Sequence, residues 1–154
     1  MADSQAWGLV SVRVTSPHPG ESTAYARQHP LTLGRATTFD RLDPRLSAME
    51  ALCGAVAGDL IDTFRRVARE RRLEVDEIEA TVEAEMENPL VHLGVVGEMG
   101  SPALGRLQVK AYASSFDPAE TVLQAWQDAL PRAPVWTTLC RAVPDATAVL
   151  KIAH

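Results

Sequence analysis

The chain of 154 residues is poor in cysteine and aromatic residues and has no long apolar run. Its two cysteines, Cys53 and Cys140, are too few for the disulfide framework that holds small secreted proteins together. No segment approaches the roughly 20 consecutive apolar residues that cross a bilayer, and the N-terminus carries no apolar signal segment. These absences predict a cytoplasmic protein without a membrane partner.

Charge and side-chain chemistry exclude further classes of function. The formal net charge of −5 argues against nucleic acids and anionic membranes as main partners. The four histidines lie scattered, without a second histidine or a cysteine three or four residues away, so no metal site is indicated. The chain also has no glycine-rich phosphate loop and no serine nucleophile elbow. We therefore expect neither a metal nor a cofactor.

The chain does have one long amphipathic segment. Residues 46–72 carry apolar side chains every three or four positions, which predicts a long helix with a buried stripe. The stripe consists of Met49, Leu52, Val56, Leu60, Phe64 and Val67. Asp59 borders this stripe, where a carboxylate is costly unless it is paired, protonated or hydrated. Asp59 is therefore a candidate functional residue.

Shorter elements flank this helix on both sides. Alternating side chains and turn residues before it predict strands at 7–15, 21–28 and 30–34, followed by a polar loop at 36–45. In residues 73–87 the even-numbered positions from Ile78 to Met86 are apolar and most odd-numbered positions are glutamates. This alternation predicts a half-buried strand with one hydrated acidic face.

The C-terminal part contains further strands and two helices. Strands are predicted at 90–98, 104–114 and 146–152. The sequence Asp-Pro-Ala-Glu at 117–120 predicts a helix that begins with Asp117 as its N-cap. The run VWTTLCRA, after two prolines, predicts a short second helix.

This order of elements indicates an α+β fold. We expect a single domain spanning 1–154, made of an N-terminal sheet (7–34), a central helix (46–72) and C-terminal strands and helices (73–154). A helix with such a continuous apolar stripe needs cover on more than one side. A second copy of the chain would supply that cover, so we predict a homodimer.

The start of the central helix resembles the OsmC/Ohr proteins, which are thiol-dependent organic hydroperoxide reductases and their relatives. Many members begin this helix with Ser-Pro-Met-Glu, then leucines, small residues and a reactive cysteine. Here the run is Ser47-Ala48-Met49-Glu50, then Leu52 and the small residues before Asp59. The resemblance implies an intertwined homodimer, with antiparallel sheets packed on the long helix and an active site at the dimer interface. It also implies that Asp59 occupies the position of the peroxidatic cysteine.

A second landmark of this family is Cys-Pro-Val at the start of the short C-terminal helix. That cysteine is the resolving thiol. This chain keeps Pro134-Val135 but has Ala133 at the cysteine position. A carboxylate cannot be oxidised to a sulfenic acid, and an alanine cannot resolve one. We therefore expect the family's thiol peroxidase activity to be absent, and name no catalytic residue.

The alternative is a hydroperoxide reductase that uses the relocated thiols of Cys53 and Cys140. Cys53 lies six residues before Asp59, which places it about 120° away around the helix. Cys140 lies seven residues after Ala133, two helical turns on. For the two thiols to meet, the displacement of Cys53 from position 59 and that of Cys140 from position 133 would have to compensate each other. Two cysteines that pack as small apolar side chains are the simpler interpretation.

If the pocket persists without its thiols, it is expected to bind a small apolar or peroxide-like ligand. Its predicted lining is Glu50, Asp59, Pro134 and Trp136, with Asp59 as a hydrogen-bond acceptor or, less simply, as a general base for hydrolytic or isomerase chemistry. Asp59 could equally be a hydrated or ion-paired residue without a selected role.

The role of Glu50 and the identity of the pocket arginine each have two interpretations. Ser47-x-x-Glu50 also reads as a capping box, which needs no active site. The family's active-site arginine has two candidates here, Arg35 and Arg41, and no motif selects between them.

Overall fold

A computed structural model describes residues 8–35 and 43–153 of the chain. The chain forms two compact units, Met1–Ala51 and Leu52–His154, and each is described by itself. Among the helices of the described residues, none combines the length and the apolar character needed to cross a bilayer.

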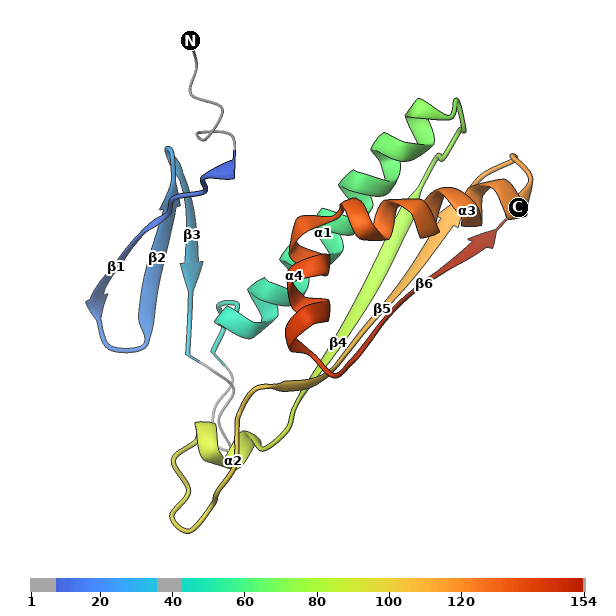
Figure 1. Cartoon of the computed structure of the whole chain (residues 1–154). Helices are drawn as coiled ribbons and strands as arrows, with labels where there is room; N and C mark the ends of the chain where they lie inside the picture. Colours follow the sequence, from blue (N-terminus) through green and yellow to red (C-terminus); the bar gives the residue numbers. More distant parts are fainter. Residues whose placement is uncertain (1–7, 36–42, 154) are drawn as a thin grey trace. The chain divides into compact units, whose positions relative to one another are not determined.

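The first unit contains a three-stranded antiparallel sheet in the order β1-β2-β3 (Figure 1). The strands are β1 (Arg13–His18), β2 (Glu21–Ala26) and β3 (His29–Leu33). None of their side chains is fully buried within the chain. The strand β1 begins at Arg13, later than in the predicted strand 7–15, and there its pairing with β2 begins opposite Tyr25.

Helix α1 (Ala48–Glu70) confirms the predicted long helix. It begins with the predicted capping box: the Ser47 hydroxyl accepts from the Glu50 amide at 3.1 Å, and the Glu50 carboxylate accepts from the Ser47 amide at 3.0 Å. Its last turn ends where Arg72 adopts a left-handed conformation (φ 57°) and the Leu73 amide donates to the carbonyl of Ala68.

The second unit contains a three-stranded sheet in the order β4-β5-β6. Its strands are β4 (Ile78–Met86), β5 (Leu104–Ser114) and β6 (Asp145–Ala153). The predicted alternation along β4 is confirmed, with apolar side chains half-buried and polar ones, mainly glutamates, exposed. The β4–β5 pair is antiparallel, whereas β5 and β6 run parallel because helices α3 and α4 connect them.

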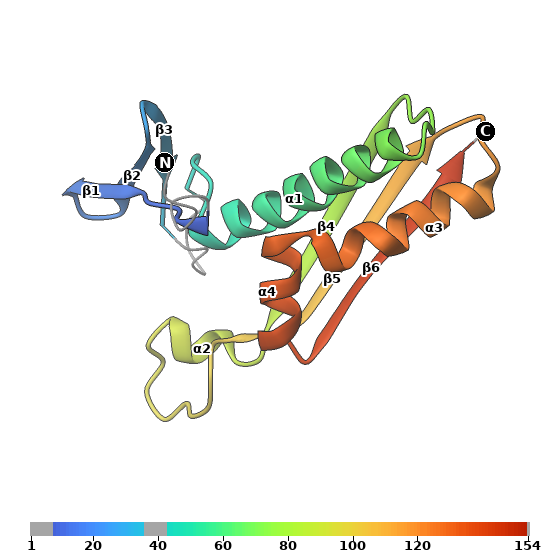
Figure 2. The ribbon, with the colours of Figure 1, turned by 45° about the horizontal axis from the view of Figure 1, so that its top comes forward.

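Three helices cover one face of this sheet (Figure 2). They are α1, α3 (Ala119–Ala129) and α4 (Pro134–Ala142), with a 3₁₀ turn, η2 (Leu130–Arg132), between the last two. The core lies between the helices and the sheet, where Phe64 and Trp126 meet edge to face with ring centroids 5.4 Å apart. This mixture of helices and sheets confirms the α+β class.

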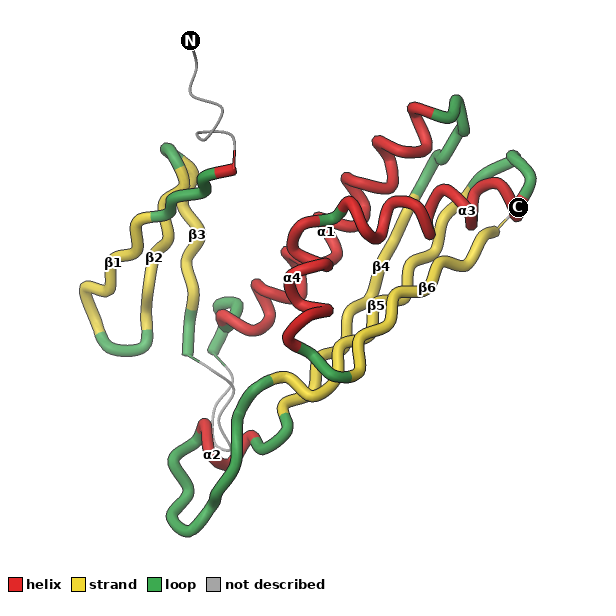
Figure 3. Tube along the Cα trace, viewed as in Figure 1, coloured by secondary structure: helices red, strands yellow, loops and turns green. Residues whose placement is uncertain are grey.

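Two local predictions are wrong. Residues 90–98 do not form a strand: Pro89–His92 is a short helix, α2, followed by the exposed loop that Figure 3 shows between α2 and β5. The Asn88 side chain caps α2 by accepting from the Leu90 amide, which favours a helical turn over an extended chain.

Asp117 also does not cap α3. Its carboxylate accepts from the Glu74 amide at 2.6 Å, in the segment that leads into β4. The N-cap residue of α3 is Pro118, and no side chain among the described residues caps the helix. The Asp117 carboxylate therefore binds the backbone amide of Glu74, which is distant in the sequence, and does not cap the start of α3 as the local sequence predicts.

Candidate functional site

Asp59 joins two helices of the second unit. Its side chain extends from α1 to the start of α4, where Oδ2 accepts hydrogen bonds from the backbone amides of Val135 at 2.9 Å and Trp136 at 3.1 Å. The two amides follow Asp59 by more than seventy residues in the sequence. The carboxylate is therefore paired with donors, which resolves the cost of an acid beside the buried stripe.

The sequence at the start of α4 explains why it needs this partner. The N-cap residue Ala133 has no side-chain oxygen, and Pro134 at the first helical position has no amide proton. The first free amides are those of Val135 and Trp136, and local residues cannot satisfy them. A carboxylate at a helix N-terminus is favoured by hydrogen bonding and by the helix dipole. Asp59 thus acts as a non-local N-cap.

The structure brings Asp59 and Ala133, the two positions at which the resemblance implies cysteines, into one site. Ala133 is fully buried, and the amides bonded to Asp59 belong to the second and third residues after it. Trp136 is 6% exposed and belongs to the core, whereas Pro134 is exposed. Of the predicted pocket residues, Asp59, Pro134 and Trp136 therefore lie around the start of α4.

The other predicted pocket residue, Glu50, belongs to the first unit. It is exposed, and its carboxylate bonds with Ser47. The hydrogen bond from the Ser47 amide, followed by that with the Ser47 side chain, lowers the pKa of Glu50 below its ordinary value. Capping of α1 is confirmed, and a part for Glu50 in a ligand pocket stays a prediction.

Asp59 retains one unused acceptor. Within the described ranges 8–35 and 43–153, its Oδ1 atom receives no hydrogen bond, and the side chain is partly exposed. A carboxylate in this position can accept a hydrogen bond from a ligand or hold a helix start, but it cannot carry out thiol redox chemistry.

The two remaining cysteines lie on different helices. Cys53 is half-buried on α1 and Cys140 is exposed near the end of α4. Desolvation raises the pKa of Cys140 above its ordinary value. This shift lowers the thiolate fraction at neutral pH, which is opposite to what a peroxidatic cysteine needs.

The candidate arginines are placed only in part. Arg35 is exposed and its backbone amide donates to Asp43, while Arg41 lies outside the described residues. Sequence reasoning missed Arg45, which pairs with Asp43 at 2.9 Å and with Glu21 at 2.9 Å. The side-chain hydrogen bond from Arg45 lowers the pKa of Asp43 strongly. No local motif marks Arg45, because Glu21 approaches it only in the folded unit.

Among the residues that the structure describes, no group of three or more histidine, cysteine, aspartate or glutamate side chains could hold a metal ion. The site at the start of α4 is correspondingly built from one carboxylate, two amides and apolar neighbours.

Comparison with solved structures identifies the fold. The chain is similar to an OsmC-like protein from Mycoplasma pneumoniae, with a TM-score of 0.78 and 14% identity, over 95% of this chain and 98% of that one. It is also similar to an organic hydroperoxide resistance protein from Elizabethkingia anophelis, with a TM-score of 0.70 and 8% identity over 94% and 98% of the two chains. The organic hydroperoxide resistance protein OhrB of Bacillus subtilis gives a TM-score of 0.61 and 16% identity over 92% and 98%.

No family sequence model and no curated protein sequence matches the chain. The structural matches confirm the predicted OsmC-like fold. At these identities they establish the fold alone.

Proposed function

We propose that this protein is an OsmC-like protein that does not reduce hydroperoxides through thiols and acts by binding. The observation that carries the proposal is the pair of hydrogen bonds from the Val135 and Trp136 amides to Asp59 Oδ2. The place where the family resemblance expects a reactive thiol holds a carboxylate with a structural task. Ala133 stands where the resolving thiol is expected.

Peroxide reduction by two thiols requires specific atoms. A thiolate attacks the O–O bond, its sulfur becomes a sulfenic acid, an alcohol leaves, and a second thiol displaces water to form a disulfide. Asp59 offers oxygen in place of the first sulfur, and the methyl group of Ala133 replaces the second. Neither of the two electrons that the peroxide needs can come from these side chains.

The proposed binding function depends on the Asp59 oxygen that does not cap the helix. Oδ1 is open to a donor, and Pro134 is exposed beside it. A small apolar molecule with one O–H group, such as a hydroperoxide or an alcohol, fits this combination. In this proposal Glu50, Asp59, Pro134 and Trp136 line the ligand site at the interface of a cytoplasmic homodimer.

Two features support the homodimer. Gly54 and Gly58 lie inside the continuous helix α1, although a Cβ at either position would meet nothing within 4 Å. Glycine inside a helix costs about 1 kcal/mol of stability relative to alanine. Close approach of a second chain to α1 would explain why glycine stands at these two positions. The sheet β1-β2-β3 likewise has no fully buried side chain of its own.

The test of the proposal is turnover of cumene hydroperoxide with dithiothreitol as reductant. We expect no turnover above the rate without protein, in the wild type and in Cys53→Ser and Cys140→Ser alike. Turnover in the wild type that either substitution abolishes would contradict the proposal and establish the alternative, a reductase with relocated thiols.

The ligand site and the dimer need separate measurements. Cumyl alcohol, added to the protein, should quench or shift the tryptophan fluorescence, and Asp59→Ala should weaken that response. An unchanged spectrum in the wild type would remove the binding function. Sedimentation should give a dimer that weakens when Gly54 is replaced by leucine, and a stable wild-type monomer would exclude the dimer.

A further inference from the structure

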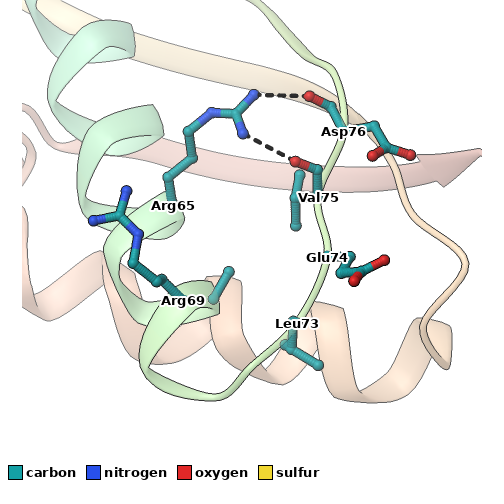
Figure 4. Close-up of a pocket in the computed structure, with 7 residues that line it drawn as sticks. Arg65, Arg69, Leu73, Glu74, Val75 and Asp76 are labelled. Atoms are coloured by element: carbon teal, nitrogen blue, oxygen red, sulfur yellow. Dashed lines mark hydrogen bonds between the residues drawn. The ribbon is translucent and has the colours of Figure 1, made fainter.

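A groove lies between the last turns of α1 and the segment that leads into β4 (Figure 4). Its volume is about 320 Å³, near the lower end of the range for small-molecule sites. It is lined by Arg65, Arg69, Leu73, Glu74, Val75 and Asp76, with Ala68 beside them. It shares no residue with the predicted pocket around Asp59.

The wall of the groove is fixed in place. Arg65 donates from its guanidinium to the carbonyls of Val75 at 3.0 Å and Asp76 at 3.2 Å, as Figure 4 shows. On the other side of the same segment, the Ser115 hydroxyl donates to the Glu74 carbonyl at 2.6 Å. The segment from 73 to 76 therefore keeps its distance from α1 through side-chain hydrogen bonds, and the groove does not depend on a ligand to form.

The arginine side chains at this end of α1 differ in whether they have an ion-pair partner. Arg66 pairs with Asp62 within the helix, and Arg71 pairs with Asp128. The Arg69 side chain makes no hydrogen bond or ion pair with any residue that the structure describes. A guanidinium carries five N–H donors, so Arg65 also retains donors beyond the two that hold the wall.

The arrangement of charge and apolar surface selects the ligand. In Figure 4 the Arg65 side chain reaches across the gap, the guanidinium of Arg69 lies along α1 and turned away from the gap, and the carboxylates of Glu74 and Asp76 also point away from it. Ala68 is 2% exposed, and Leu73 and Val75 are half-buried, so the gap also has an apolar wall. Arginine binds carboxylates through paired N–H···O bonds, and the apolar wall favours a hydrocarbon body.

We infer that this groove binds a small organic carboxylate with a short aliphatic body. The carboxylate group binds the remaining donors of Arg65 and the guanidinium of Arg69, which turns toward the groove when the ligand binds, and the body lies against Ala68, Leu73 and Val75. This inference goes beyond the function proposed above, because it concerns a different surface and does not depend on Asp59.

The experiment is a titration of the full chain with hexanoate, followed by NMR at Ala68, Leu73 and Val75. We expect saturable binding in the wild type and a loss of about tenfold or more in Arg69→Ala, as for a charge-assisted hydrogen bond. Arg69→Lys keeps the charge but not the planar fork, so its loss should be smaller than that of Arg69→Ala.

Two controls keep the result specific. Arg66→Ala removes a positive charge from the same helix but outside the groove, and it should leave the affinity unchanged. Hexan-1-ol has the same body without the charge and should bind at least tenfold more weakly than hexanoate. Absence of saturation with hexanoate, equal losses in the Arg66 and Arg69 variants, or equal binding of the alcohol would each overturn the inference.

Discussion

The starts of α1 and α4 solve the same problem in two different ways. At α1, Ser47 and Glu50 satisfy each other's amides within four residues of chain. At α4, the cap position holds alanine, and the free amides are satisfied by Asp59 on another helix. The first cap stabilises a helix alone, whereas the second also ties α4 to α1.

This difference bears on function, because the non-local cap stands where the family resemblance places a redox centre. A cysteine at position 59 would meet the start of α4 with a thiol, and an aspartate meets it with hydrogen-bond acceptors. The fold brings position 59 and the start of α4 together, and in this chain the contact between them is a helix cap.

The largest effect is expected from Asp59→Ala. It leaves the Val135 and Trp136 amides without an acceptor, so unfolding should become easier by about 1–2 kcal/mol, as for loss of a helix N-cap. Urea unfolding followed by tryptophan fluorescence measures this, because Trp126 and Trp136 are both buried in the second unit. Asp62→Ala is the matched control: among the described residues its exposed carboxylate pairs with Arg66 alone, so the loss should stay near 0.5 kcal/mol or less. Equal losses in the two variants would contradict the capping role.

A smaller loss, about 1 kcal/mol, is expected from Ser47→Ala at the local cap. The Glu50 carboxylate still accepts from the amide of residue 47 in this variant, so only one of the two bonds is lost. Urea unfolding followed by far-ultraviolet circular dichroism reports the loss. A larger loss of unfolding free energy in Ser47→Ala than in Asp59→Ala would contradict the predicted order of the two caps.

The two kinds of cap can be exchanged at α4. Ala133 has an extended backbone (φ −86°, ψ 111°), which suits an N-cap, so Ala133→Ser supplies a local oxygen. We expect this substitution to recover about 0.5–1 kcal/mol of unfolding free energy in the Asp59→Ala background. In the wild-type background the gain should be smaller, because the amides are already bonded. Equal effects in both backgrounds would show that position 133 and Asp59 do not share the same amides.

The smallest effect concerns acid. Because the hydrogen bonds with Ser47 lower the pKa of Glu50, its contribution to stability is present above the ordinary value of 4.5 and disappears as the pH falls through the lowered folded value. Glu50→Gln should therefore lower the stability slightly at neutral pH and leave it unchanged at acid pH, so that the two profiles converge as the pH falls. Thermal unfolding of both proteins across that range measures this. Parallel profiles would exclude the coupling.

Much of the fold could be predicted because the signals are local. The stripe around Phe64 has helical spacing, the even-numbered apolar residues of β4 have strand spacing, and the Ser47–Glu50 pair is a contiguous motif. The strand predicted at 90–98 failed because Asn88 and Pro89 start a helical turn that the apolar run concealed.

The candidate site could be predicted only in part. Asp59 stood out because its charge borders an apolar stripe, yet no local pattern reveals its bonds to Val135 and Trp136. Asp117 shows the reverse case, since a convincing local capping motif gives way to the Glu74 amide. The carboxylates of Asp59 and Asp117 both accept hydrogen bonds from backbone amides that only the tertiary fold brings near.

The most direct test of the account is hydrogen exchange at the amides of Val135 and Trp136, measured by NMR in the wild type, Asp59→Ala and Asp62→Ala. If Asp59 is the cap of α4, both amides are protected in the wild type and exchange roughly 5–30 times faster in Asp59→Ala, the factor that corresponds to 1–2 kcal/mol. Asp62→Ala should leave them unchanged. Equal exchange in the wild type and in Asp59→Ala would contradict the claim that the position expected to hold the reactive thiol has become a structural link.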